Sequence, residues 1–152
     1  MKMLMRMLFV FALLSVSAFF IASPGFAETA NDKMEIQKVM KGTWEKPDAP
    51  LRVDPIVIVI DYAIADWAQG DMGGRALLKR KAGAWSIILC SGDALKSEEA
   101  LTKAAVPANI AALLAKSLAV AERGLDPQVL AQFSRFEGLV MMDQAGNHPH
   151  GH

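Results

Sequence analysis

The chain has 152 residues, with 16 basic and 16 acidic side chains, and so carries no formal net charge at pH 7. This balance argues against a nucleic acid or an anionic membrane as the partner, because either needs clustered Lys and Arg. The length suits a single domain. Cys90 is the only cysteine and cannot form an internal disulfide, so it is a buried apolar side chain, a metal ligand or an intermolecular thiol.

The first 27 residues have the pattern of a secretory signal peptide. Lys2 and Arg6 make the start positive, residues 7–22 are apolar or small throughout, and small residues precede a predicted cleavage after Ala27. Removing residues 1–27 takes away two basic and no acidic residues, which leaves a net charge of −2. The apolar run is shorter than the roughly 20 residues that span a bilayer. We therefore expect an exported, periplasmic protein with no membrane anchor after cleavage.

A helix over residues 28–44 is predicted first, because apolar residues recur at helical spacing and Pro47 ends the pattern. Strands are then predicted at residues 53–60, 63–69, 75–81 and 84–90. The first is a continuous β-branched run that is apolar on both faces, and Asp61-Tyr62 is its predicted turn. The side chains of the later strands alternate in the two-residue period, and glycine-containing turns join these strands. In the last of these strands, Trp85, Ile87 and Leu89 are expected on one face and Cys90 on the other.

Helical spacing returns after Asp93. Ser97, Pro107 and the pair Asp126-Pro127 are typical helix starts, and residues 138–142 form either a last short strand or an extended arm. The sequence thus predicts an α+β domain over residues 28–140, with an N-terminal helix, an antiparallel meander of about four strands and two to three C-terminal helices. We expect the helices to cover one face of the sheet and to build a single core. The predicted core residues are Ile36, Met40, Trp67, Leu77 or Leu78, Trp85, Ile87, Leu89, Ile110, Leu114 and Phe133.

Residues 141–152 are predicted to be a flexible tail that contains every histidine of the chain. Neutral imidazole binds copper, zinc and nickel, and alternating histidines on a flexible segment can gather around one ion. A simple polar chain end is the alternative. Thioethers suit Cu(I), although adjacent methionines are more often packing residues. The candidate copper ligands are Met72, Cys90, Met141, Met142, His148, His150 and His152.

Catalysis is not predicted. The body of the domain contains no histidine for acid–base work, and no metalloprotease, P-loop or nucleophile-elbow motif is present. An enzyme would need polar side chains such as Asp66, Asp71, Arg75 and Asp93 to converge in a cleft. Carboxylates near turns more often bond to their own local backbone.

Residues 61–95, DYAIADWAQGDMGGRALLKRKAGAWSIILCSGDAL, resemble the copper uptake system-associated proteins, a family of small exported bacterial proteins. WEKPDAPLRVDPIVI at residues 44–58 and RGLDPQVLAQFSRFEG at residues 123–138 extend the resemblance over most of the exported chain. Its most distinctive part is WAQGDMGGR at residues 67–75. The resemblance implies a link to outer-membrane copper uptake and to periplasmic copper chaperones. It implies no catalytic residues and supplies no ligand set.

Two functions follow as hypotheses. The first is a periplasmic accessory protein of copper acquisition that binds or hands over copper or assists a copper chaperone; its partners would be the copper ion, an outer-membrane receptor and that chaperone. The second is a non-catalytic module that binds a small ligand or a protein segment on the concave face of the sheet and has no metal site of its own. The Gly70–Arg75 turn and Cys90 stand out here, because sheet packing alone does not require them.

Overall fold

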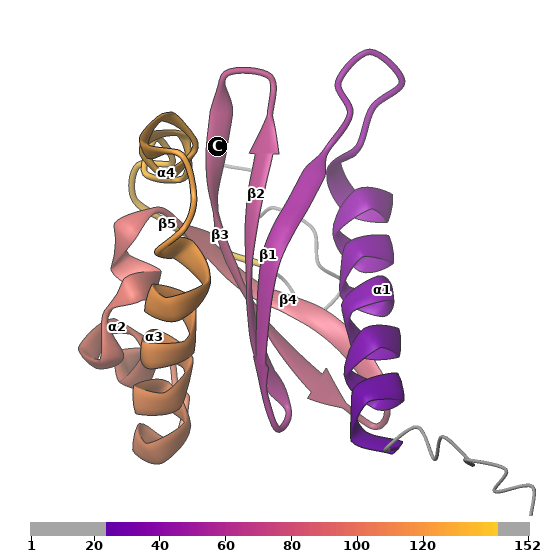
Figure 1. Cartoon of the computed structure of the whole chain (residues 1–152), viewed down its shortest axis with the longest axis vertical. Coiled ribbons are helices and arrows are strands. Elements are labelled where there is room, and N and C mark those ends of the chain that lie inside the picture. Colours follow the sequence, from indigo (N-terminus) through magenta and orange to yellow (C-terminus); the bar gives the residue numbers. More distant parts are fainter. Residues whose placement is uncertain (1–23, 143–152) are drawn as a thin grey trace, which may run out of the picture.

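The computed structural model describes residues 24–142 and has an antiparallel sheet between two layers of helix (Figure 1). The strands are neighbours in chain order, and they are β1 (Arg52–Val59), β2 (Tyr62–Gln69), β3 (Met72–Lys81), β4 (Ala84–Ser91) and β5 (Leu139–Met141). The α+β class and the meander are confirmed. The sheet has five strands rather than about four, because residues 139–141 pair with β4.

Helix α1 (Pro24–Trp44) lies on one face of the sheet, and the C-terminal helices lie on the other (Figure 1). The latter are the 3-10 helix η1 (Asp93–Lys96) and the α-helices α2 (Glu98–Lys103), α3 (Ala108–Glu122) and α4 (Pro127–Phe133). Two predicted caps are confirmed, since the Ala100 amide donates to Ser97 and the Gln128 amide donates to Asp126. Pro107 is the cap of α3 rather than its first residue.

Helix α1 begins earlier than predicted, at Pro24 instead of residue 28. Proline is well suited to the first position of a helix, where its missing N–H has no intrahelical partner in any case. The predicted cleavage after Ala27 therefore falls inside α1. Within residues 24–142, no helix is both long and apolar enough to cross a membrane.

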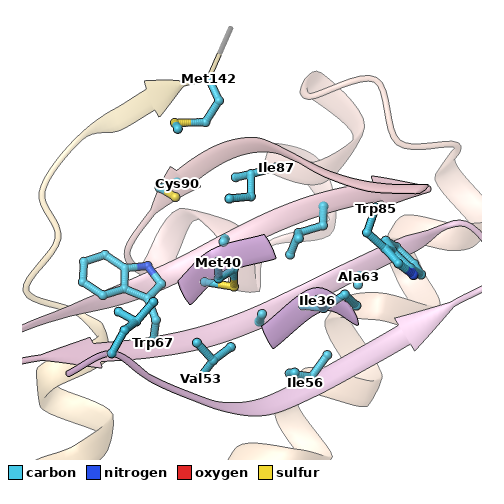
Figure 2. Close-up of a cluster of buried hydrophobic side chains, with 14 residues drawn as sticks. Ile36, Met40, Val53, Ile56, Ala63, Trp67, Trp85, Ile87, Cys90 and Met142 are labelled. Carbon is cyan, nitrogen blue, oxygen red and sulfur yellow. The ribbon is translucent and has the colours of Figure 1, made fainter. Parts of the chain in front are cut away.

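Because helices cover both faces, the prediction of one core is wrong and the domain has two. The core under α1 contains Ile36, Met40, Trp67, Leu78, Trp85 and Ile87 (Figure 2). The core under the C-terminal helices contains Ile64, Leu77, Leu89, Ile110, Leu114 and Leu118. Successive residues of a strand point to opposite faces, so the apolar residues at adjacent positions of β3 serve one core each.

A β-bulge in β4 overturns the predicted facing of its side chains. Leu77 of β3 pairs with Leu89 and Leu78 pairs with Ile87, so β4 contains one extra residue, Ile88. An extra residue in one strand reverses the alternation beyond it. Leu89 therefore joins the core under the C-terminal helices, while Cys90 turns toward α1 beside Ile87 (Figure 2).

The folded domain extends beyond the predicted boundary at residue 140. Strand β5 runs through Met141, and the Met142 amide donates to the Ile88 carbonyl at 2.9 Å. The Met142 side chain is buried on the α1 side of the sheet with Cys90 (Figure 2). Residues 143–152 lie outside the described part of the chain.

Candidate functional site

An apolar pocket opens on the α1 side of the sheet and encloses about 260 Å³. Helix α1, β2, β3, β4 and the segment after α4 all contribute to its wall. The lining residues are Trp44, Leu51, Trp67, Gln69, Met72, Cys90 and Phe136. Elsewhere the α1 face is occupied by α1 itself and by Trp85, which is 5 % exposed. A ligand lying broadly across this face has no room there, and the pocket is an opening at one end of it.

Three aromatic rings form one wall of the pocket. The Trp44 and Trp67 rings lie 6.3 Å apart between centroids at an angle of 33°, and Phe136 meets Trp67 edge-on at 5.7 Å. Aromatic pairs at such separations are mutually attractive and set each other's orientation. The Trp67 Nε1–H is buried, and no acceptor reaches it within residues 24–142. The wall is therefore preformed and contains an unsatisfied donor.

Gln69 ties the pocket to the connection between α1 and β1. Its side-chain amide nitrogen donates to the Trp44 carbonyl at 2.9 Å and to the Ala49 carbonyl at 2.7 Å. Nearby, the Leu51 amide donates to the Glu45 carboxylate, which lowers the pKa of Glu45 with help from Lys41. Both amide hydrogens of Gln69 are used, so this side chain can bond a further partner only by accepting through its oxygen.

Met72 and Cys90 both line the pocket, but at separate places. Cys90 pairs with Ala76 in the sheet, and Met72 comes four residues before Ala76 on the same strand. At about 3.3 Å per residue this separates the two positions by roughly 13 Å along the strand. Ligand sulfurs sit about 2.3 Å from the ion they share. The two sulfurs are therefore not a ready-made coordination pair.

Burial also makes Cys90 a poor ligand as it stands. The side chain is 1 % exposed, and burial raises the pKa of its thiol to about 12. Because the thiolate is the form that binds metals, a metal would have to displace a firmly held proton. Met72 is 47 % exposed. Among residues 24–142, no cluster of three or more His, Cys, Asp or Glu side chains could hold a metal ion.

The two candidate ligands at the end of β5 differ in exposure. Met141 is 51 % exposed, whereas Met142 is 8 % exposed and belongs to the α1-side core. This alternation follows from the strand, since neighbouring side chains point to opposite faces. His148, His150 and His152 lie outside the described residues. Met141 is thus the exposed sulfur closest in sequence to the histidines.

The segment Gly70–Arg75 is held by residues 132–136, which we call the strap. Strand β3 begins at Met72 rather than at the predicted residue 75, so Gly73 and Gly74 lie in the strand and not in the turn. The Gln132 side chain donates to the Gly70 and Met72 carbonyls at 2.8 and 3.0 Å, and the Phe136 amide donates to the Gly73 carbonyl at 3.0 Å. A Cβ on Gly73 would come within 2.8 Å of the Gln132 carbonyl oxygen, and one on Gly74 within 2.8 Å of the Phe136 Cβ. Packing therefore does require these glycines, contrary to the sequence interpretation.

Arg75 is the centre of a buried polar cluster beneath the strap. Its guanidinium donates to Glu122 through Nε at 2.8 Å and Nη2 at 2.6 Å, and to Asp93 and the Phe133 carbonyl through Nη1 at 3.1 and 3.3 Å. The Phe133 ring centroid lies 5.8 Å from the guanidinium carbon. Arg75 therefore connects β3 to η1, α3 and α4 at one point.

Asp66 faces the same cluster and is fully buried. Its Oδ1 is 3.7 Å from Arg75 Nε, and no hydrogen-bond donor reaches either of its oxygens within the described chain. Burial raises the pKa of Asp66 to about 8; the charge of Arg75 opposes this, and the charge of Glu122 and a hydrogen bond with it add to it. At neutral pH Asp66 is thus mainly a neutral acid, whose O–H can donate a hydrogen bond to Glu122.

Asp93 behaves oppositely because it is exposed and well supplied with donors. The Ser134 hydroxyl donates to it at 2.7 Å and is the main cause of its lowered pKa, with Lys96 and Arg75 adding to the effect. Of the four polar residues considered for catalysis, Asp66, Arg75 and Asp93 converge, while Asp71 is exposed at the turn. None of the four lines the aromatic pocket.

Sequence reasoning missed Glu122, Gln69 and Phe136 as parts of these sites. Glu122 had a usable signal, because it continues the four-residue spacing of Ile110, Leu114 and Leu118 along the buried side of α3. A carboxylate in that position requires a buried cation. Gln69 and Phe136 gave no comparable signal, since their roles depend on contacts with segments distant in the sequence.

Comparison of this chain with protein-family models, with curated proteins and with solved structures finds no match in any of the three.

Proposed function

We propose that this protein is a periplasmic accessory protein of copper acquisition, which takes up copper at its C-terminal end and assists a copper chaperone. The copper context is supported by the sequence resemblance of residues 44–138 to the copper uptake system-associated proteins. The observation that carries the copper site is the exposure of Met141 at the end of β5. Its thioether precedes three histidines within eleven residues of chain.

The chemistry of this segment suits copper in both oxidation states. A thioether is a soft ligand that favours Cu(I), and imidazole binds either copper ion. Met141 is anchored by β5, which pairs with β4 through three residue pairs. In this proposal the Met141 thioether and the histidine side chains bind one copper ion together and hold it at the edge of the sheet. The body of the domain contributes the scaffold in this proposal, because Met72 and Cys90 are well separated.

A competition titration tests the proposal. The chain from Glu28 to His152 is titrated with Cu(I) and with Cu(II) against a chelator of known affinity, alongside a variant that ends at Met142. We expect dissociation constants below micromolar for the longer chain and a loss of at least tenfold on truncation. Met141→Leu should weaken Cu(I) binding, whereas the matched variant Met72→Leu should leave it unchanged.

Two results would contradict the proposal. One is binding no better than micromolar for either copper ion. The other is equal affinity of the truncated and longer chains, which would move the site into the domain body. The truncation leaves β5 and Met142 in place, so loss of copper binding cannot be attributed to loss of the strand.

A further inference from the structure

The aromatic pocket is a second place where this protein can bind a partner molecule, and it is distinct from the C-terminal segment. All seven residues that line it have uncharged side chains, since the Cys90 thiol keeps its proton. Ligand sites for small molecules are typically concave and mainly apolar, with a few polar groups that set orientation. An uncharged lining of this kind selects against ions and favours a neutral, apolar ligand.

The size of the pocket limits the ligand. A cavity of 150 Å³ lined by apolar side chains is known to bind benzene, and this pocket encloses about 260 Å³. It therefore has room for a ligand of one or two fused rings. The Trp44, Trp67 and Phe136 rings line it at stacking and edge-on angles, and a planar ring would extend that arrangement.

Two side chains of the lining have hydrogen-bonding capacity left, Gln69 through its oxygen and Trp67 through its buried Nε1–H. The amide nitrogen of Gln69 is committed to the Trp44 and Ala49 carbonyls, which leaves its oxygen as the acceptor for a ligand. These two bonds also hold the Gln69 side chain in one orientation, so that little conformational entropy is lost on binding. A ligand with an N–H or O–H group is therefore favoured over one without a donor.

We propose that this pocket binds a small, uncharged, planar aromatic molecule of one or two fused rings that donates a hydrogen bond to Gln69. The ligand is a free small molecule, because one or two rings are enough to fill a volume of about 260 Å³. Met72 is the most exposed residue of the lining. None of the residues that line the pocket belongs to the proposed copper site. Either proposal can therefore fail without the other.

Indole is the probe that matches these requirements, and nitrogen-detected NMR of the chain from Glu28 to His152 is the measurement. The three tryptophans give separate indole N–H signals. We expect the Trp44 and Trp67 signals to shift and saturate, with a dissociation constant of about 0.1 mM for a ligand of this size. Trp85 is the internal control, because its Nε1 donates to Asp32 at 3.0 Å and it does not line the pocket.

Two variants of exposed methionines separate pocket binding from surface binding. Met72→Trp should obstruct the mouth and weaken indole binding at least tenfold, and Met34→Trp, at a 61 % exposed position on α1, should leave it unchanged. The analogue 1-methylindole, which has no N–H, should bind at least fivefold more weakly than indole. Tryptophan in a short peptide should bind more weakly than free indole.

Several outcomes would overturn the proposal. Absence of saturable shifts of Trp44 and Trp67 up to 5 mM indole, or an equal shift of Trp85, would exclude the pocket as the site. Equal binding to the Met72→Trp and Met34→Trp variants would do the same. Equal affinity for 1-methylindole and indole would show that the ligand does not donate a hydrogen bond to Gln69. Tighter binding of the peptide than of indole would identify a protein segment as the ligand.

Discussion

Arg75 and Arg80 lie on the same strand, β3, but serve opposite sides of the sheet. Arg75 is 1 % exposed beneath the C-terminal helices, where it pairs with Glu122, Asp93 and Asp66. Arg80 is 23 % exposed on the α1 side, where it pairs with Asp32 and Asp61 and lies over the Trp85 ring. Arg75 is thus a buried centre of the fold, whereas Arg80 is a partly exposed link between β3 and α1.

The two faces of the sheet should differ in how much a substitution lowers the stability of the domain. The face under the C-terminal helices buries charged groups, and each of these depends on a partner because a buried charge without one is costly. The α1 face is held mainly by apolar contacts and retains an open pocket at one end. We therefore expect substitutions under the C-terminal helices to affect stability more than matched substitutions under α1.

The largest expected effect comes from replacing the two arginines in turn. Arg75→Met leaves Glu122 buried without its cation and should destabilise the domain by about 3–5 kcal/mol. Arg80→Met also removes the cation from a buried carboxylate, Asp32, but Trp85 still donates to it and the arginine is 23 % exposed, so the loss should be smaller, about 1–2 kcal/mol. Urea unfolding followed by circular dichroism measures both. Similar losses for the two variants would show that the faces do not differ in this way.

The buried acid Asp66 gives the second effect, which depends on pH. Its folded pKa of about 8 lies above the unfolded value of 3.8. Between these values the folded protein retains a proton that the unfolded chain has lost, so the free energy of unfolding falls as pH rises from about 4 to 8. The slope then disappears, because Asp66 is ionised in both states. We expect a total loss of a few kcal/mol over this window.

Asp66→Asn should remove that slope, because an amide does not titrate. Urea midpoints of both proteins between pH 4 and pH 9 measure it, and Asp71→Asn at the exposed turn is the control that should keep it. Histidines do not interfere within residues 24–142, since the sequence has none there. A flat profile for the unmodified protein would contradict the raised pKa of Asp66.

The third prediction concerns the strap. Gly73→Ala places a methyl group 2.8 Å from the Gln132 carbonyl oxygen and 2.9 Å from the Trp67 carbonyl oxygen. Backbone atoms on both sides cannot give way as a side chain could, so a loss of about 1–3 kcal/mol is expected. Thermal unfolding measures it. Because Phe136 lines the pocket, the Trp44 and Trp67 indole N–H signals should shift in this variant even without ligand.

The smallest effect is a gain on the α1 side. Gly42 lies inside α1, and a Cβ there would meet no atom within 4 Å. Gly42→Ala should therefore stabilise the domain by about 0.5–1 kcal/mol, because glycine loses more conformational freedom on folding than alanine. We expect the midpoint of thermal unfolding of this variant to be higher than that of the unmodified protein. A decrease would indicate that this end of α1 is more closely packed than the α1 face as a whole.

Local sequence patterns predict most of the helices and strands of this protein, and most of their ends to within a few residues. A continuous β-branched run predicts β1, alternating side chains and glycine turns predict β2 to β4, and the caps Ser97 and Asp126 begin α2 and α4 where they were expected. These are local effects, since strand alternation and helix capping depend on residues only a few positions apart. The pairing of residues 139–141 with β4 was left open, because a three-residue segment has little pattern of its own.

The face that each side chain occupies, and the contacts between distant residues, follow from the folded arrangement and not from local patterns. The bulge at Ile88 moved Leu89 and Cys90 to faces opposite those that simple alternation predicts. Helices on both sides divided the expected single core into two. The convergence of Asp66, Arg75 and Glu122 joins residues up to 56 positions apart, and periodicity in one segment holds no information about such contacts.

Gly73 and Gly74 also have a role that local sequence patterns do not reveal. From the sequence, Gly73 and Gly74 supply a flexible turn, and nothing indicates that another chain segment lies against them. In the structure the 132–136 strap packs directly against these two glycines. The strap contributes Phe133 to the polar cluster and Phe136 to the aromatic pocket. The space that a missing side chain leaves is filled by whatever packs there, and only the folded arrangement determines what that is.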